Sequence, residues 1–215
     1  DQRGADPRKR RDGSVAGVLW LGYRVPWLGT SLDRHDSVLS SGSAADGAIL
    51  LRRFLLGVGA QSRDGTYQSA IGHSYGSLVL AWAARGTTGL RAIALVGSPG
   101  TGAASTGALK VPPRSVFVLH AYNDPIARTN WFGEGEHDTD HLPGIRPLST
   151  GDAIIAGLQL RAVSGHSGYF VRGSTSLFNL ATIIINRADD AVVARVGQDD
   201  FGDDLSWPLP TLVTD

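Results

Sequence analysis

The sequence has 215 residues with 42% hydrophobic and 19% charged side chains, a composition typical of a single globular domain with a sizeable core. Its 20 basic and 20 acidic residues give zero net charge, which argues against nucleic acid and anionic membranes as partners. The chain has no cysteine, which excludes disulfides, thiol catalysis and cysteine-ligated metals, and no apolar run approaches the ~18 residues of a transmembrane segment.

The chain begins with a charged stretch in which arginines mix with aspartates. We interpret residues 1–14 as a flexible segment, because the acids among its bases weaken the alternative of a nucleic-acid-binding arm. No signal peptide is visible and methionine is missing even at position 1, so we expect a processed product or a piece of a longer precursor. Residues 197–215 are predicted to form an acidic tail, which leaves residues 15–196 as the folded domain.

Strand and helix signals alternate through this domain, which predicts an α/β fold: a mostly parallel sheet with helices on both faces. Residues 15–22 are apolar on both faces, as a buried parallel strand should be. Ser43 with Asp46 resembles a capping box at a helix start, and Ser174 or Thr175 is the predicted N-cap of the last helix. Strands are predicted at 15–22, 67–71, 91–96, 115–121 and 158–163, helices at 43–58, 78–85 and 174–186, and a polar excursion at 126–153.

The second predicted strand runs into a helix through residues 72–76, GHSYG, which fit the pattern Gly-x-Ser-x-Gly. In a nucleophile elbow the serine occupies a strained strand-to-helix turn, and we expect both flanking glycines to be needed because Cβ atoms there would collide with backbone. Ser74 would then be a nucleophile, and the backbone N–H of Tyr75 would stabilise an oxyanion. In a chain with 28 glycines the alternative is a glycine-rich turn with an inert serine, so the strand–turn–helix context carries this interpretation.

Two further polar residues follow later predicted strands. Asp124 comes after the strand at 115–121 and His166 after the strand at 158–163. Because ligands bind at the carboxyl ends of parallel strands, we expect both to lie near Ser74. His166 would take the serine proton and Asp124 would orient the imidazole, and the order Ser, Asp, His is that of an α/β-hydrolase triad. Asp138 and Asp140 are rival candidates for the acid.

Several short motifs stand out along the chain. They are Trp20-Leu21-Gly22-Tyr23 with Pro26 downstream, Gly72-His73-Ser74-Tyr75-Gly76-Ser77, Gly97-Ser98-Pro99-Gly100, Asp124, and Gly165-His166-Ser167 with Tyr169. Together they resemble a family of largely uncharacterised actinobacterial α/β-hydrolases. The resemblance covers residues 15–186 and implies a serine hydrolase fold with Ser74, Asp124 and His166 as the triad, but it implies no substrate.

The chain departs from that family pattern at its start, where the first strands are missing. In the α/β-hydrolase fold the nucleophile follows the fifth strand, so residues 15–22 correspond to the fourth, and the first three have no counterpart here. The third strand of the fold lies between the fourth and fifth, and the loop after it donates the second oxyanion N–H. We therefore expect an upstream segment, present as a companion chain, to complete the sheet. Direct pairing of 15–22 with 67–72 would contradict this.

The sequence offers weaker signals for other chemistry. The stretch EGEHDTDH, with Glu134, Glu136, His137, Asp138, Asp140 and His141, has ligands suited to Zn or Ca, but we interpret it as a solvated acidic loop. His120 is predicted to be a core or second-layer histidine, and His35 and His73 carry no clear signal. We predict no metal and no cofactor. The predicted function is hydrolysis of a small-molecule or lipid ester, with an acyltransferase or a non-catalytic binding module as alternatives.

Overall fold

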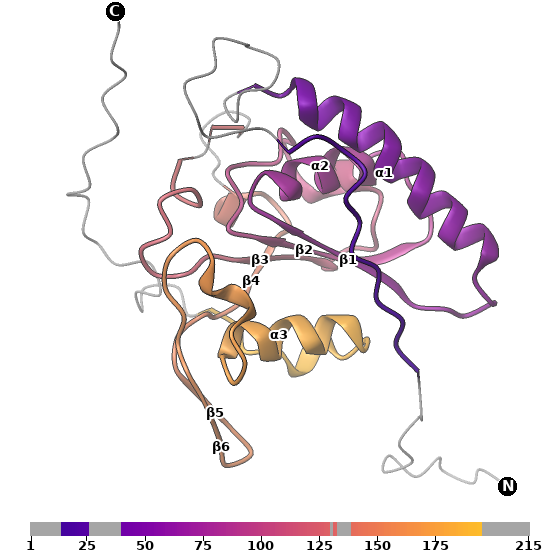
Figure 1. Ribbon diagram of the computed structural model, residues 1–215. Helices are drawn as coiled ribbons and strands as arrows, with labels where there is room; N and C mark the ends of the chain where they lie inside the picture. Colours follow the sequence, from indigo (N-terminus) through magenta and orange to yellow (C-terminus); the bar gives the residue numbers. More distant parts are fainter. Residues whose placement is uncertain (1–13, 26–39, 130, 133–138, 195–215) are drawn as a thin grey trace, which may run out of the picture.

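The computed structural model describes residues 14–25, 40–129, 131–132 and 139–194 (Figure 1). Four strands form one parallel sheet in the order β1-β2-β3-β4, and two further strands form a separate antiparallel pair. The main elements are α1 (Gly42–Gln61), β1 (Gln68–His73), α2 (Tyr75–Ala84), β2 (Leu90–Val96), β3 (Val116–Leu119), β4 (Arg146–Pro147), β5 (Ala153–Ile155), β6 (Leu158–Leu160) and α3 (Thr175–Ile184). Short 3-10 helices are η1 (Thr106–Leu109), η2 (Thr139–His141), η3 (Gly168–Phe170) and η4 (Ala188–Asp190).

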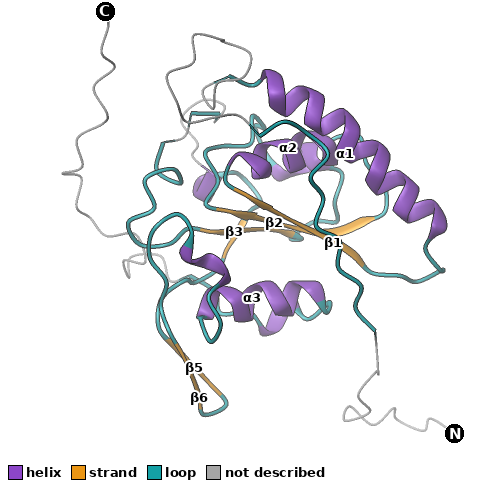
Figure 2. Cartoon of the chain, viewed as in Figure 1, coloured by secondary structure: helices purple, strands orange, loops and turns teal. Residues whose placement is uncertain are grey.

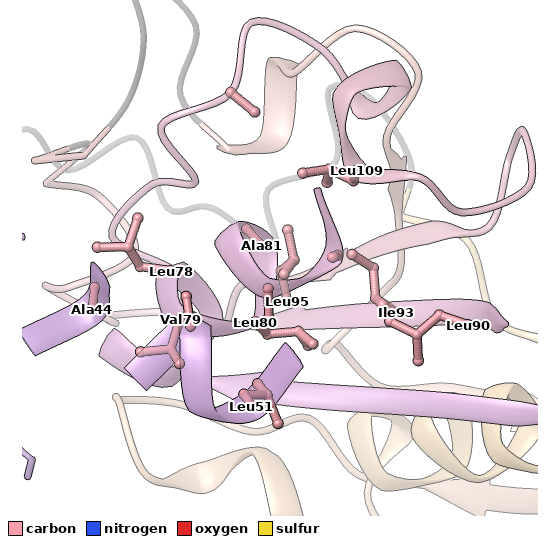
Figure 3. Close-up of a cluster of buried hydrophobic side chains, with 14 of the residues drawn as sticks. Ala44, Leu51, Leu78, Val79, Leu80, Ala81, Leu90, Ile93, Leu95 and Leu109 are labelled. Carbon is pink, nitrogen blue, oxygen red and sulfur yellow. The ribbon is translucent and has the colours of Figure 1, made fainter. Parts of the chain in front are cut away.

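One face of the sheet is covered by α2, with α1 packed against α2 (Figure 1). Helix α2 is apolar around most of its circumference because it lies between the sheet and α1, and a helix buried on all sides needs no polar face. Figure 3 shows the resulting cluster, to which Leu78 and Leu80 of α2 and Ile93 and Leu95 of β2 all contribute. This packing fixes the start of α2 over the end of β1, where Ser74 lies.

The opposite face is covered by α3, so helices lie on both sides of the sheet as predicted (Figure 2). The Ser174 side chain accepts a hydrogen bond from the Leu177 N–H at 3.1 Å, which confirms the predicted N-cap. Leu180 and Ile183 of α3 share a buried cluster with Phe117 of β3. The α/β fold class predicted from the sequence is therefore confirmed.

Several predicted elements differ from the structure. The helix predicted at 43–58 spans Gly42–Gln61, so its N-cap is Ser41 and not Ser43; Ser41 makes no side-chain cap bond, and Ser43 is buried within the first turn. The predicted last strand at 158–163 contributes only β6, which pairs antiparallel with β5 through a turn at Ala156 and Gly157, both with positive φ. The fourth strand of the main sheet is instead β4, inside the predicted polar excursion.

Residues 15–22 do not form the predicted buried strand. They run without regular secondary structure, and the side chains of Leu19 and Leu21 are 85% and 75% exposed. Trp20 is the exception, because it packs, with the adjacent Tyr23, against the buried cluster that α1 and α2 share. A strand needs a hydrogen-bonded neighbour, and among the described residues nothing pairs with this segment or with the outer edge of β1.

The described helices include none that is long and apolar enough to cross a membrane. The two predicted terminal segments fall almost entirely outside the described residues, which begin at residue 14 and end at residue 194.

Candidate active site

Ser74 occupies the turn between β1 and α2 with φ 56° and ψ −134°, a conformation that non-glycine residues rarely adopt. The turn is held to the sheet by the Ser74 N–H, which donates to the Val96 carbonyl at 2.9 Å. A Cβ at Gly72 would lie 2.7 Å from the Gly76 carbonyl oxygen, so the first glycine of the motif is required. The expected collision is wrong for the second glycine, Gly76, because outside the neighbouring backbone of α2 the nearest atom to an added Cβ is the Tyr23 hydroxyl oxygen at 3.9 Å.

Tyr75 begins α2, so its backbone N–H is one of the helix N–H groups without an acceptor in the preceding turn. Its buried side chain joins the two helices: the hydroxyl accepts from the Ala44 N–H at 2.9 Å and donates to the Ser40 carbonyl at 2.6 Å. Burial raises the pKa of Tyr75 to about 12, so the phenol stays neutral. These two hydrogen bonds fix the position of Tyr75, and with it the backbone N–H that follows Ser74.

Asp124 lies in the loop after β3 and is completely buried. Its carboxylate accepts hydrogen bonds from the N–H groups of Ile126 and Ala127 and, at 2.5 Å, from the Tyr169 hydroxyl. Burial raises the pKa of Asp124, but hydrogen bonds from His166 and Tyr169 outweigh it and hold that pKa below its ordinary value. The carboxyl therefore remains ionised although no water reaches it.

His166 connects the buried acid to the serine. Its Nδ1 lies 2.9 and 3.0 Å from the two Asp124 oxygens, and its Nε2 lies 2.7 Å from the Ser74 Oγ. The His166 side chain is 25% exposed and the Asp124 side chain is fully buried, so solvent reaches this series of hydrogen bonds from the side of Ser74 and not from the side of Asp124. The loop before it is anchored beside the acid, because the Gly165 N–H donates to the Tyr122 carbonyl at 2.7 Å. The structure thus brings together the three side chains predicted from the sequence.

Gly97, directly after β2, makes room for this arrangement. An added Cβ there would lie 2.7 Å from an Asp124 oxygen, 3.0 Å from the Tyr169 ring and 3.3 Å from the His166 ring. Its φ of 56° is also in the region that favours glycine. The absence of a side chain at this position is therefore a condition for the acid and the imidazole to meet.

The sequence profile of the alpha/beta hydrolase family matches residues 3–133, more than half of the chain. The chain belongs to the alpha/beta hydrolase family. Uncharacterised proteins of Mycobacterium bovis and of two Mycobacterium tuberculosis strains are each 34% identical to it over 149 residues, which is 67% of this chain and 53% of theirs. The chain thus spans about half the length of the curated relatives it matches. No solved structure matches it significantly.

Membership of the alpha/beta hydrolase family confirms the resemblance seen in the sequence, and the matched relatives are actinobacterial as expected. Sequence reasoning nevertheless missed the roles of three residues around the triad. Gly97 and Tyr169 were part of the family motifs, but nothing in their spacing indicated that they contact Asp124. His73 gave no signal, and it lies against His166 with ring centroids 4.7 Å apart.

The rival acids and most of the candidate metal ligands lie outside the part of the chain that the structure describes: Asp138, most of the EGEHDTDH stretch and the side chain of Asp140. His141 is exposed in η2, and the described residues contain no group of three or more potential metal ligands. His120 is 3% exposed, which confirms that it is a core histidine.

Two shallow cavities of about 300 and 640 Å³ lie at the other edge of the sheet, where the strands begin. Both are lined by Tyr67, Arg91 and Ser115, among others, and neither by Ser74, Asp124 or His166. In open parallel sheets ligands bind at the carboxyl ends of the strands, and the triad residues lie at that edge. Both of these cavities are therefore remote from Ser74, Asp124 and His166.

We expect Gly97→Ala to disrupt the site and to destabilise the fold by about 1–3 kcal/mol, because the new Cβ meets Asp124 and the backbone conformation is strained. Gly157→Ala is the matched control, since Gly157 has φ 82° and no atom within 4 Å of an added Cβ. Urea unfolding and the reaction of Ser74 with a fluorophosphonate would be compared. If both variants lose the same stability and the same labelling rate, backbone strain explains the effect of Gly97→Ala, and crowding of Asp124 does not.

We expect Tyr169→Phe to raise the pKa of Asp124, because a hydrogen bond to a buried carboxylate is lost. The same loss should lower the free energy of unfolding by about 1.5–3 kcal/mol at neutral pH. An acid whose pKa is lowered by folding stabilises the native state above its ordinary pKa, and loses that contribution as pH falls through the native pKa. The cost of the substitution should therefore shrink on acidification. Unfolding curves across pH test this, with Tyr67→Phe as control; a pH-independent cost would contradict the carboxylate's role.

Proposed function

We propose that this chain carries the active site of a serine hydrolase that cleaves ester bonds through an acyl-enzyme on Ser74. The observation that supports it is the continuous hydrogen-bonded chain from the Ser74 hydroxyl through His166 to Asp124. A serine hydroxyl is a weak nucleophile at neutral pH and needs an adjacent base that is itself oriented by a third group. In this proposal His166 is the base and Asp124 is the group that orients it.

In the proposed reaction the Ser74 Oγ attacks the ester carbonyl carbon while His166 Nε2 takes the hydroxyl proton. The carbonyl oxygen becomes an oxyanion, and the Tyr75 N–H donates a hydrogen bond to it. When the C–O bond to the leaving group breaks, His166 returns the proton to the departing alcohol. Water then repeats the sequence with the same base, which releases the acid and restores Ser74. Asp124 stays ionised throughout and stabilises the imidazolium.

The substrate class is an ester with an apolar acyl group, from a small molecule or a lipid. An alcohol leaves more readily than an amine, so an ester demands less of the site than an amide. Exposed apolar side chains lie close in sequence to both triad loops: Tyr122 two residues before Asp124, and Phe170 and Val171 just after His166. They would contact an acyl chain that reaches Ser74.

Two alternatives use the same residues. In an acyltransferase, an acceptor alcohol replaces water in the second half of the reaction, and the ratio of transfer to hydrolysis products distinguishes it. A non-catalytic binding module is the other alternative, because only one oxyanion donor, the Tyr75 N–H, is identified among the described residues. Covalent labelling of the serine separates this module from either enzyme.

We expect a fluorophosphonate probe to label the protein, and Ser74→Ala to abolish the labelling. Ser62→Ala, at the end of α1, is the matched control and should label as the parent does. An unlabelled parent protein favours the binding module.

We propose further that a strand from a companion chain pairs with the outer edge of β1. No described residue pairs with that edge, and β1 is only partly buried along most of its length. Residues 15–22 present exposed apolar side chains, although Trp20 holds them to the domain. A strand between this segment and β1 would satisfy the backbone groups of β1 and cover those side chains.

If a companion strand binds here, we expect Leu19→Lys and Leu21→Lys to release the bound polypeptide. Both variants should leave the isolated chain as stable as the parent, because the two side chains are exposed there. Native mass spectrometry of the purified assembly would detect that loss, and Ile154→Lys on the β5–β6 hairpin is the control, being 74% exposed. A single polypeptide that labels fully with the probe, and whose β1 amides exchange rapidly with solvent, would contradict the companion strand.

A further inference from the structure

His73 is a half-buried titratable residue that the proposed reaction does not use. It is the last residue of β1 and directly precedes Ser74. Its imidazole Nε2 lies 2.7 Å from the main-chain carbonyl oxygen of His166. A carbonyl oxygen can only accept a hydrogen bond, so in the neutral ring the hydrogen must be on Nε2. The structure therefore specifies one tautomer of His73.

The same ring also packs against the segment that carries His166. The His73 and His166 rings are 4.7 Å apart at an angle of 33°, and the rings of Tyr169 and Phe170 lie 5.8 and 5.7 Å from His73. All three neighbours come from one short stretch, residues 166–170. The strand that supports the nucleophile thus contacts the base-bearing loop through a hydrogen bond to its backbone and through ring packing.

The charge state of His73 matters because its closest titratable neighbour must accept a proton. Burial lowers the pKa of His73, and the nearby His166 ring lowers it further, while the hydrogen bond to the His166 carbonyl and the charge of Asp124 act in the opposite direction. Tyr169, the other titratable group packed on this ring, donates its hydroxyl hydrogen to Asp124. A neutral His73 adds no charge beside His166 when that ring becomes an imidazolium.

We propose that His73 is a positioning residue, which holds the His166 imidazole over Ser74 by its hydrogen bond to the His166 carbonyl and its contact with the His166 ring. The two bonds made by the ring nitrogens of His166 fix its rotation, but not the position of the loop that carries it. The bond from His73 ties that loop to the end of β1, and hence to the elbow. This inference rests on the proposed function, since it supposes that His166 activates Ser74.

Two substitutions separate the hydrogen bond from the ring. His73→Phe keeps an aromatic ring and removes the donor, whereas His73→Gln keeps an N–H donor at a similar distance and removes the ring. Because a small displacement of a reacting group can cost up to about 100-fold in rate, we expect His73→Phe to slow fluorophosphonate labelling about tenfold or more. His73→Gln should recover part of that loss. His141→Phe, on exposed η2, is the control for replacing a histidine by an aromatic.

A spectroscopic measurement tests the geometry without relying on reactivity. Nitrogen-15 NMR of the imidazole rings should show His73 as the Nε2–H tautomer at neutral pH, with its signal identified by its loss in His73→Gln. An Nδ1–H tautomer would overturn the inference. So would labelling of His73→Phe at the parent rate, or equal losses in the Phe and Gln variants, and these outcomes leave the proposed function standing. If the parent protein is not labelled at all, both the proposed function and this inference fail.

Discussion

The structure around the candidate site depends on one carboxylate that is removed from water. Asp124 is completely buried, and an ion in that position is tolerated only if hydrogen bonds replace its hydration. Donors come from its own loop and from Tyr169 and His166, both of which precede α3. Gly97 at the end of β2 supplies the necessary space. Three separate stretches of chain are therefore positioned by the need to satisfy one group.

The loop that carries His166 is held from two sides, and each contact involves a different part of the sheet. On one side it runs beside the Asp124 loop, where Ser164 forms a parallel bridge with Tyr122. On the other side His73, at the end of β1, reaches the His166 carbonyl. Since β1 and β3 are both paired with β2, the separation of these two contacts is set by the spacing of the sheet. The distance between His166 and Ser74 thus depends on the packing of the whole domain.

The sequence predicted those features that depend on local pattern or on the ends of apolar strands. Ser74 could be found because its turn requires a glycine at position 72, and Asp124 and His166 because each follows an apolar run. The role of His73 could not be predicted, since its acceptor is a backbone carbonyl 93 residues away and any residue type would supply it. Strand β4 was missed because it has only two residues, Arg146 and Pro147, and two residues show no periodicity. For β6, the alternating pattern was correct, but pattern alone does not distinguish a strand of the main sheet from one arm of a hairpin.

The wrong prediction of a strand at residues 15–22 has a different origin. The hydrophobicity of a segment can be read from its own residues, but strand formation also requires a neighbouring strand to pair with. An edge strand exposed to solvent is usually protected by charged residues, a proline or a cover, since its free backbone groups invite association. Strand β1 (QSAIGH) contains no formally charged residue and no proline, and no described residue pairs with its outer edge. It therefore lacks the charges and the proline that usually protect an edge strand. An unprotected edge strand and an unpaired apolar segment on the same domain are both explained if one further strand lies between them.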